Sequence, residues 1–369
     1  MTITQAMVRG GVLEVTFAGV ELADVLSARG QVSADGGWPT CSVFVTVKPT
    51  VGNEEDTISV TAGTSNIGVR FVGRVRRFRP SAFPKSMEML AMGTLAYAAE
   101  WAPSEDIFFD EVFPSGATDQ AIVQWALHFV PGVTYTSGNI GGTGTTLGVS
   151  APEAFDWSAG TSAWSYVQQL DRATQYRTYQ THDGTIRRVQ MIGHPSSETP
   201  QFTLANEDVL DGSSASRNTE QTRNAALVRG HDYGDGTGPV LGAAYSANIR
   251  GDGSDPATRF PEEFSSNLIE DGNDEDGVPV GEHGLNAQAI AEVILSDVDK
   301  EFVEASIRTW RDDLHGPGMT CTLDTLDRLA INEIMWVQDY AWEVSDQGWM
   351  ATYGLTGGGL PQDYTPPPV

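Results

Sequence analysis

The chain has 369 residues, of which 40% are apolar, so it can bury several hydrophobic cores, and usual domain sizes predict two to four domains. Its 49 acidic and 22 basic side chains give a formal net charge of -27, which disfavours specific nucleic-acid binding because such binding relies on Lys and Arg to displace counterions. The sequence contains neither a signal peptide nor an apolar run long enough to span a membrane, so we expect a soluble protein with no membrane span and no cleaved export signal.

Residues 1–97 show the alternation of apolar and polar side chains that is typical of half-buried β-strands. The alternating runs are Leu13 to Phe17, Cys41 to Val47, Ile58 to Ala62 and Val69 to Val75. Turn-forming residues such as Ala34 to Gly37 separate them. The sequence therefore predicts a β-domain, a barrel or a sandwich, in this part of the chain.

Helical periodicity appears between residues 98 and 197. Thr118 or Asp119 can cap a helix that carries Ile122, Trp125, Ala126 and Phe129 on one face. A second helix is predicted at Ser162 to Thr174. A hairpin from Tyr176 to Ile192 follows, because Asp183-Gly184 is a turn signal between two alternating runs. These elements predict a small α/β domain.

The C-terminal part combines one helix with further strands. Residues 232–281 are rich in Asp and Gly and poorly periodic, so we expect a long acidic loop there. A helix is predicted near Asn286 to Ser296, and strands are predicted at residues 319–323, 336–344 and 349–355. The Pro-rich end, residues 360–369, cannot pair within a central strand. The predicted fold class is β-rich α+β.

The sequence carries no known catalytic motif, so we expect a protein that is not an enzyme. Cys41 and Cys321 lack metal-binding spacing and are interpreted as core residues. Two aromatic and acidic clusters could nevertheless line a sugar cleft, because a glycosidase needs only two suitably placed carboxylates. They are Trp101 with Glu105 and Asp106, and Trp310 with Asp312 and Asp313. The alternative is that these aromatic residues simply pack against a barrel.

A calcium site is one interpretation of the acidic segment. Asp271, Asn273, Glu275 and Glu282 supply oxygen ligands at positions 1, 3, 5 and 12 of a loop, the spacing of a calcium-binding loop. Position 6 is Asp276, where such loops need glycine, and no helix is evident before it. The alternative is a solvated acidic loop that binds no cofactor.

Basic side chains are concentrated between Arg70 and Arg79. On a regular strand Arg70, Arg74 and Arg76 share one face, opposite the apolar side chains of the same run. In an acidic protein such a face is a candidate for ion pairing with another subunit. A solvated strand face is the alternative, because exposed ion pairs contribute little to stability.

The order of four segments resembles the hub proteins of tailed-phage baseplates and tail tips, including the late-control and tail-associated hub families. The segments are VRFVGRVRRFRP (69–80), TSAWSYVQQLDRATQYRTYQTHDGTIRRVQ (161–190), RNAALVRG (223–230), and LNAQAIAEVIL with DDLHGPGMTCTL (285–295 and 312–323). The resemblance implies two tail-tube-like β-barrels with an inserted small α/β domain.

In this chain, residues 1–97 would form the first β-barrel hub domain, with return strands near residues 198–232. Residues 98–197 would form the inserted α/β domain, and residues 233–369 the second β-barrel hub domain with the acidic loop and one helix. Three such chains would present six barrels and match a sixfold tail tube, while offering threefold symmetry to the tip below.

The function implied by the resemblance is a structural, trimeric tail tip or baseplate hub protein of the virion, which closes the tail tube and connects it to tip or fibre proteins for genome ejection. Distal tail or tail tube proteins and the tape-measure protein are the other expected partners, and assembly would take place in the host cytoplasm. The acidic excess would serve solubility or a channel through which DNA slides. The alternative function is a carbohydrate-binding or carbohydrate-degrading tail protein that acts on the host surface.

Overall fold

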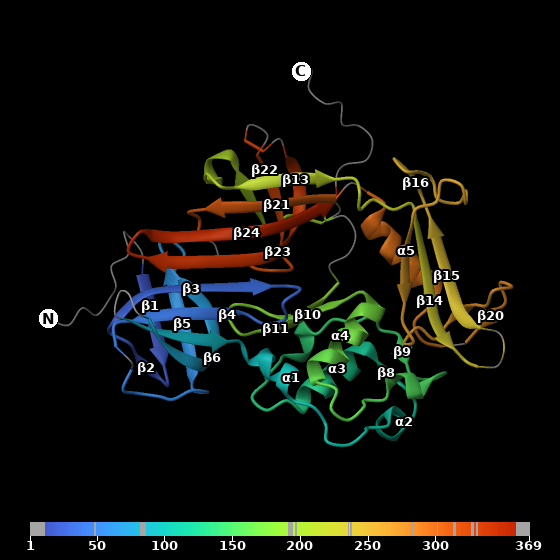
Figure 1. The fold of residues 1–369 in the computed structure, drawn as a ribbon, viewed down its shortest axis with the longest axis horizontal. Helices are drawn as coiled ribbons and strands as arrows, with labels where there is room; N and C mark the ends of the chain where they lie inside the picture. Colours follow the sequence, from blue (N-terminus) through green and yellow to red (C-terminus); the bar gives the residue numbers. More distant parts are fainter. Residues whose placement is uncertain are drawn as a thin grey trace, which may run out of the picture.

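The computed structural model describes residues 12–358 except 48, 82–85, 191–194, 196–197, 235, 237, 282, 301, 313–314, 326–327 and 330. The chain folds into a large β-sheet, a mixed α/β part and a smaller sheet covered by a helix (Figure 1). It is β-rich with a helical middle part, so the predicted β-rich α+β class is confirmed. The Pro-rich end lies outside the described residues.

The N-terminal half of the large sheet contains the strands predicted from alternation. Its strands are β1 (Val12–Phe17), β2 (Val20–Glu21), β3 (Val25–Ser33), β4 (Thr40–Val45), β5 (Thr57–Gly63), β6 (Gly68–Ser81) and β7 (Ser86–Met92). In β1, β4 and β5 every second side chain is buried, as the period of a half-buried strand requires. The sequence pattern did not predict β3 or β7.

The C-terminal half of the large sheet contains strands from two distant parts of the chain. Its strands are β12 (Phe202–Ala205), β13 (Ser214–Asn218), β21 (Phe302–Thr309), β22 (Thr320–Asp324), β23 (Asn332–Ser345) and β24 (Gly348–Gly358). We expected the return strands near residues 198–232 to join the N-terminal barrel. Instead β12 pairs with β22 and β13 pairs with β21, so these two strands extend the C-terminal half.

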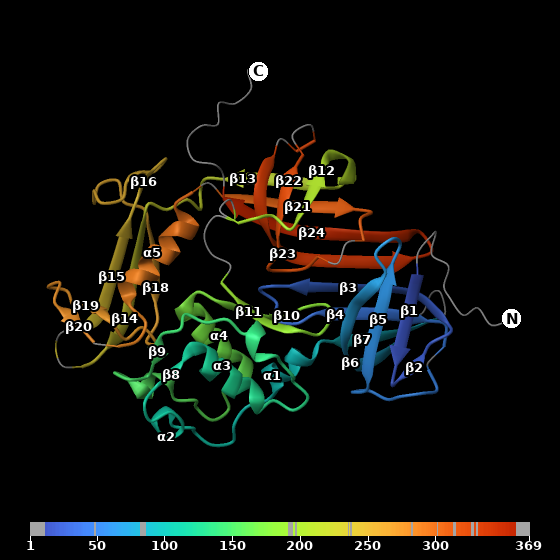
Figure 2. The ribbon, with the colours of Figure 1, turned by 180° about the vertical axis from the view of Figure 1, so that it is seen from behind.

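The two halves form one continuous sheet, with the strand order β13-β21-β24-β23-β3-β4-β7-β6-β5-β1-β2. In Figures 1 and 2 the blue strand β3 lies beside the red strand β23. One hydrophobic core contains buried residues from both halves. The described strand pairs leave this path open between β13 and β2, so two separate closed barrels stay a prediction.

The middle of the chain forms the predicted α/β part. Its main elements are α1 (Tyr97–Glu100), α2 (Phe109–Val112), β8 (Ala117–Thr118), α3 (Asp119–His128), β9 (Thr146–Leu147), α4 (Ala163–Thr174), β10 (Arg177–Gln180) and β11 (Ile186–Val189). The side chain of Thr118 caps α3, and that of Ser162 caps α4. Strands β10 and β11 pair around Asp183-Gly184, so the hairpin prediction is confirmed over its described residues.

The acidic segment folds into strands, which corrects the expected long loop. A five-stranded sheet contains β14 (Ala225–Asp232), β15 (Pro239–Tyr245), β18 (Pro261–Ser265), β19 (Gly272–Asn273) and β20 (Pro279–Val280), and β16 (Ala247–Asn248) pairs with β17 (Gly251–Asp252). Buried apolar side chains of β14 and β15 pack on α5 (Ala287–Val298), whose predicted helix is confirmed. The segment looked like a loop because four of its strands are only two residues long, too short to show an alternating pattern.

The small sheet shares one hydrophobic core with the α/β part rather than with the large sheet. The expected domain boundary at residue 233 falls between β14 and β15, which pair with each other. The division of the chain into domains stays a prediction.

Candidate functional site: the seam between the two halves of the sheet

The seam is the pairing of β3 with β23, which joins the two halves of the large sheet. Six residue pairs run antiparallel from Ser33 and Asp339 to Ala28 and Val344. Trp342 is buried, and its ring stacks on Trp349 at an interplanar angle of 7°. The seam is therefore a hydrogen-bonded and tightly packed joint, which makes the two halves one rigid surface.

Arg70 lies inside the molecule next to this seam. Two consecutive residue pairs, Val60 with Phe71 and Thr61 with Val69, leave Arg70 as the extra residue of a β-bulge. The bulge turns its side chain inward, where it is only 1% exposed. The expectation that Arg70 serves a subunit interface is therefore corrected, because a strict strand alternation no longer holds at the bulge.

The Arg70 guanidinium connects the two halves of the sheet. It donates to the backbone oxygens of Ala62, at 2.9 Å, and Asn66, at 2.8 Å, in the N-terminal half. It also donates to the backbone oxygen of Asp312 in the C-terminal half. Its charged group lies 4.5 Å from the centre of the Trp349 ring, a cation–π distance.

Asp312 connects the same two halves from the other side. Its carboxylate accepts hydrogen bonds from the consecutive backbone N–H groups of Thr64, Ser65 and Asn66 and from the hydroxyls of Thr64 and Ser65. Burial by itself would raise the pKa of Asp312, but these donors outweigh it and hold the pKa well below the ordinary carboxyl value. Asp312 is therefore ionised at neutral pH and serves as a latch between loop 64–66 and the end of β21.

The β10–β11 hairpin packs against the seam. Tyr179 donates its hydroxyl to the backbone oxygen of Pro317 at 2.8 Å, and the backbone N–H of Gln180 donates to the oxygen of Gly37 at 2.6 Å. The ring of His182 lies 6.4 Å from that of Tyr340. Burial lowers the pKa of His182. The negative charge of Asp183 opposes this effect, and the positive charge of Arg70 adds to it.

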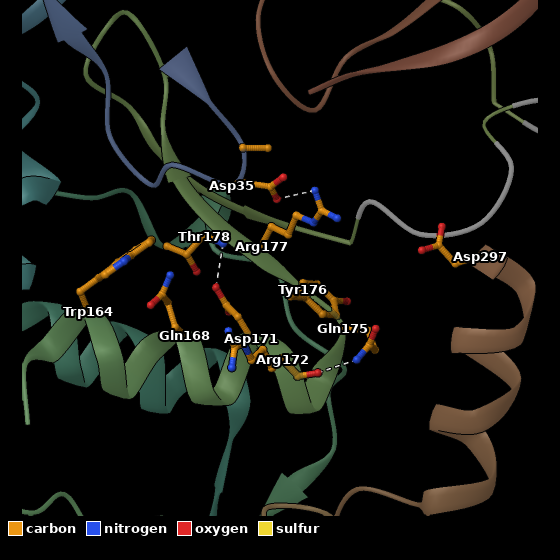
Figure 3. Close-up of a pocket in the computed structure, with 11 residues that line it drawn as sticks. Asp35, Trp164, Gln168, Asp171, Arg172, Gln175, Tyr176, Arg177, Thr178 and Asp297 are labelled. Atoms are coloured by element: carbon orange, nitrogen blue, oxygen red, sulfur yellow. Dashed lines mark hydrogen bonds and ion pairs between the residues drawn. The ribbon is translucent and has the colours of Figure 1, made fainter. Parts of the chain in front are cut away.

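A cavity of about 370 Å³ lies where the hairpin, α4 and the turn after β3 meet (Figure 3). Arg177 donates to the carboxylate of Asp35 at 2.7 Å and to the side-chain oxygen of Gln338 at 2.8 Å. The side chains of Gln168 and Thr178 also line the cavity, and Asp297 at the end of α5 lies across it. Within the described residues the buried hydroxyl of Thr178 has no hydrogen-bond partner, and a water molecule is the simplest partner for it.

A buried charge cluster holds the α/β part together, and sequence reasoning missed it. Arg188 of β11 donates to Asp119 at 2.5 Å and to Asp171 at 2.7 Å, and all three side chains are buried. The alternation in the predicted hairpin could have indicated that Arg188 is buried, because Arg188 shares a strand face with the apolar Ile186. The cluster has a structural role, because its charges are paired with one another inside the core.

Glu270 joins the small sheet to the α/β part. Its buried carboxylate accepts from the backbone N–H groups of Gly148 at 2.8 Å, Ser150 at 3.2 Å and Ala151 at 2.9 Å. Burial raises the pKa of Glu270 despite these donors. Together with the shared apolar core, this contact fixes the small sheet on the α/β part.

Arg74 and Arg76 do share a face of β6, as predicted. Both guanidinium groups lie over the ring of Tyr97, at 5.5 and 4.9 Å from its centre. Arg76 also forms ion pairs with Glu55 and Glu100. These contacts connect the N-terminal half of the sheet to α1, and contact with another subunit stays a prediction for both arginines.

Asp271, Asn273 and Glu275, three of the four proposed calcium ligands, lie at the β19–β20 hairpin and not in a loop between helices. Asp271 accepts from the side-chain amide of Asn286 at 2.8 Å, while Asn273 and Glu275 are exposed. Glu282 lies outside the described residues. No cluster of three His, Cys, Asp or Glu side chains suited to a metal ion occurs within the described ranges. Calcium binding stays a prediction for this segment.

The two suggested sugar clusters have different surroundings. Trp101 stacks on Phe129 within the aromatic core of the α/β part, while Glu105 and Asp106 are exposed nearby in the sequence. Trp310 and Asp312 both line a cavity of about 300 Å³, which also contains Thr64 and Ser65 from the N-terminal half of the sheet. Asp313 lies outside the described residues.

The fold is similar to that of solved phage tail proteins along nearly the whole chain. A tail protein from Neisseria meningitidis has a TM-score of 0.62 at 11% identity, with 94% of this chain and 96% of that chain covered. The 43 kDa tail protein of prophage MuSo2 from Shewanella oneidensis has a TM-score of 0.60 at 11% identity, with coverage of 93% and 97%.

A secretion-system protein is also similar. This is the c3393 protein of E. coli, which has a TM-score of 0.51 at 11% identity, with coverage of 96% and 79%. It is a component of the type VI secretion system with structural similarity to T4 bacteriophage tail proteins gp27 and gp5.

No family model and no curated protein sequence matches the chain. In the part of the chain that the structure describes, no helix is long and apolar enough to cross a membrane. The chain therefore has the fold of phage tail proteins, the class of protein that its sequence resembles.

Proposed function

We propose that this chain is a structural hub protein of a phage tail, located at the tail tip or baseplate of the virion. The observation that carries the proposal is a fold shared with tail proteins over at least nine-tenths of both chains. Such coverage leaves no large part of the described chain for a separate catalytic domain, which favours a role without enzymatic activity.

The proposed assembly is a trimer that closes the tail tube. Each chain contributes two β-rich halves held rigidly by the seam, so three chains would arrange six halves in alternation around one axis. The exposed edges of the path, β13 and β2, are the strands whose backbone groups would be protected in a closed ring. This arrangement would match a sixfold tube above and offer threefold symmetry to tip or fibre proteins below.

The proposed partners are distal tail or tail tube proteins, the tape-measure protein, and tip or fibre proteins. A channel through such a ring would have to let DNA pass during delivery into the host. The net charge of -27 supports this role, because an acidic wall repels the phosphate backbone, whereas a basic wall would hold it.

The experiment is native mass spectrometry of the purified full chain, followed by cryo-electron microscopy of the intact particle. We expect a species of three times the chain mass of 39.6 kDa and three copies around the tail axis. Six identical copies at the tail end, or a channel lined mainly by arginine, would contradict the hub proposal.

A further inference from the structure

Trp310 is the exposed tryptophan of this protein. The chain has nine tryptophans, and the other eight are buried or half-buried, whereas Trp310 is 57% exposed. It follows directly after β21, at the end of the strand that leads to the Asp312 latch. An exposed indole beside a cavity suggests a binding surface, because burying a large ring against a partner is favourable.

The cavity beside Trp310 is built from both halves of the sheet. Thr64 and Ser65 come from the loop after β5, and the other side chains come from the turn around residues 206–208 and the end of β21. The lining residues are Thr64, Ser65, Glu207, Asp208, Thr309, Trp310, Arg311 and Asp312. Its volume of about 300 Å³ is at the lower end of the range for small-molecule sites.

Apart from Arg311, whose guanidinium donates to Asp208 and to the backbone oxygen of Thr203, the cavity offers mainly hydrogen-bond acceptors. The hydroxyls of Thr64 and Ser65 donate to Asp312, so only their lone pairs remain for a ligand. Glu207 is exposed, and its carboxylate oxygens offer further acceptors. A ligand that fits must therefore bring several donors and an apolar face for the indole.

We propose that this cavity binds a neutral saccharide, with one sugar ring packed on the indole of Trp310. The hydroxyls of the sugar would donate to Glu207, Thr64 and Ser65. Acidic sugars are disfavoured because the three carboxylates of the lining outnumber its one basic side chain, Arg311. A peptide backbone fits less well, since it presents as many acceptors as donors to a cavity that already has an excess of acceptors.

The cavity would bind the saccharide without cleaving it. Hydrolysis of a glycosidic bond requires a carboxylic acid that is protonated when the substrate binds. Asp312 is held ionised by five donors, and Asp208 accepts from Arg311 at 3.1 Å and from the backbone N–H of Ala205 at 3.0 Å. Both carboxylates are thus engaged as acceptors, and Glu207, the third carboxylate of the lining, lacks the second free carboxylate that hydrolysis uses.

The test is a ¹⁹F NMR titration of the full chain labelled with 5-fluorotryptophan. The probes are maltohexaose, cellohexaose and chitohexaose, each up to about 10 mM, a concentration suited to weak sites. The Trp310 resonance is assigned by its absence in Trp310→Phe. We expect it to shift with at least one probe while the other tryptophan resonances stay in place.

Two variants and a matched control test the contacts by calorimetric titration. We expect Trp310→Ala to weaken binding by about tenfold or more, because it removes the stacking surface. We expect Glu207→Gln to weaken it by only about twofold to fivefold, since Gln keeps one acceptor oxygen. Phe108→Ala, which removes another exposed ring outside the cavity, should leave binding unchanged.

Two results would overturn the proposal. One is that the Trp310 resonance responds to none of the three oligosaccharides. The other is that it responds to a hexalysine peptide and to no sugar, which would make the cavity a docking site for a basic protein segment through Glu207 and the indole. Both outcomes can be read on the isolated chain, so neither depends on the proposed trimer.

Discussion

Gly30 of β3 pairs with Trp342 of β23 across the seam, and a Cβ atom added to Gly30 would lie 2.8 Å from the indole ring. The ring is buried and stacked on Trp349, so it has little space to move away. Glycine at position 30 therefore allows the two halves of the sheet to approach at the distance that strand pairing requires.

Replacing Gly30 with alanine is expected to lower the free energy of unfolding by about 1–3 kcal/mol, the usual cost of overpacking a core. Urea denaturation followed by tryptophan fluorescence measures the change. Gly138→Ala is the control, because a Cβ atom there meets no other atom within 4 Å. Equal stability of the two variants would show that the Trp342 ring can give way.

Replacing Asp312 with asparagine is expected to cost about 1–3 kcal/mol at pH 7, because an uncharged oxygen replaces the charged acceptor of five hydrogen bonds. The folded-state pKa of Asp312 is lowered, so its contribution is complete above the ordinary value of 3.8 and is lost as the pH falls through the folded-state pKa.

The deficit of this variant should therefore be constant between about pH 5 and 7 and shrink below about pH 4. Denaturation curves at a series of pH values measure it. The exposed Asp110, replaced in the same way, is the control and should change stability by less than about 0.5 kcal/mol. A deficit that grows on acidification is incompatible with the latch.

His182 is expected to make the protein less stable in mild acid. Its pKa is lowered from 6.5 in the folded state, mainly by burial, so the unfolded chain binds a proton more readily. The free energy of unfolding should fall as the pH drops below about 6.5, and it should fall less in His182→Gln. His128→Gln, at an exposed position, should follow the wild type. Parallel pH profiles for all three proteins would remove His182 as the cause.

Replacing Arg188 with methionine is expected to cost about 3–5 kcal/mol, because it leaves the buried carboxylates of Asp119 and Asp171 without their counter-charge. The measurement is thermal and urea unfolding at pH 7. Arg172→Met, at an exposed position of α4, should stay within about 0.5 kcal/mol of the wild type. If both variants are equally stable, the cluster does not hold the α/β part together.

The sequence by itself determined the elements whose patterns are local. Strands β1, β4 and β5, helices α3 and α4, and the hairpin turn at Asp183-Gly184 were predicted because periodicity, capping and turn chemistry depend on residues a few positions apart. The resemblance to tail hub proteins also came from the sequence, since the order of these local patterns along the chain carries it.

Only the tertiary structure decided how the halves join and which charges are buried. Strand β3 escaped prediction because a register irregularity between Val25 and Ser27 and the small Gly30 disturb its alternation. Arg70 was expected on the surface, but a bulge turns it inward toward Asp312, 242 residues away. The physical reason is that strand pairing and the burial of a charge depend on contacts between distant segments, which the local pattern of a sequence does not contain.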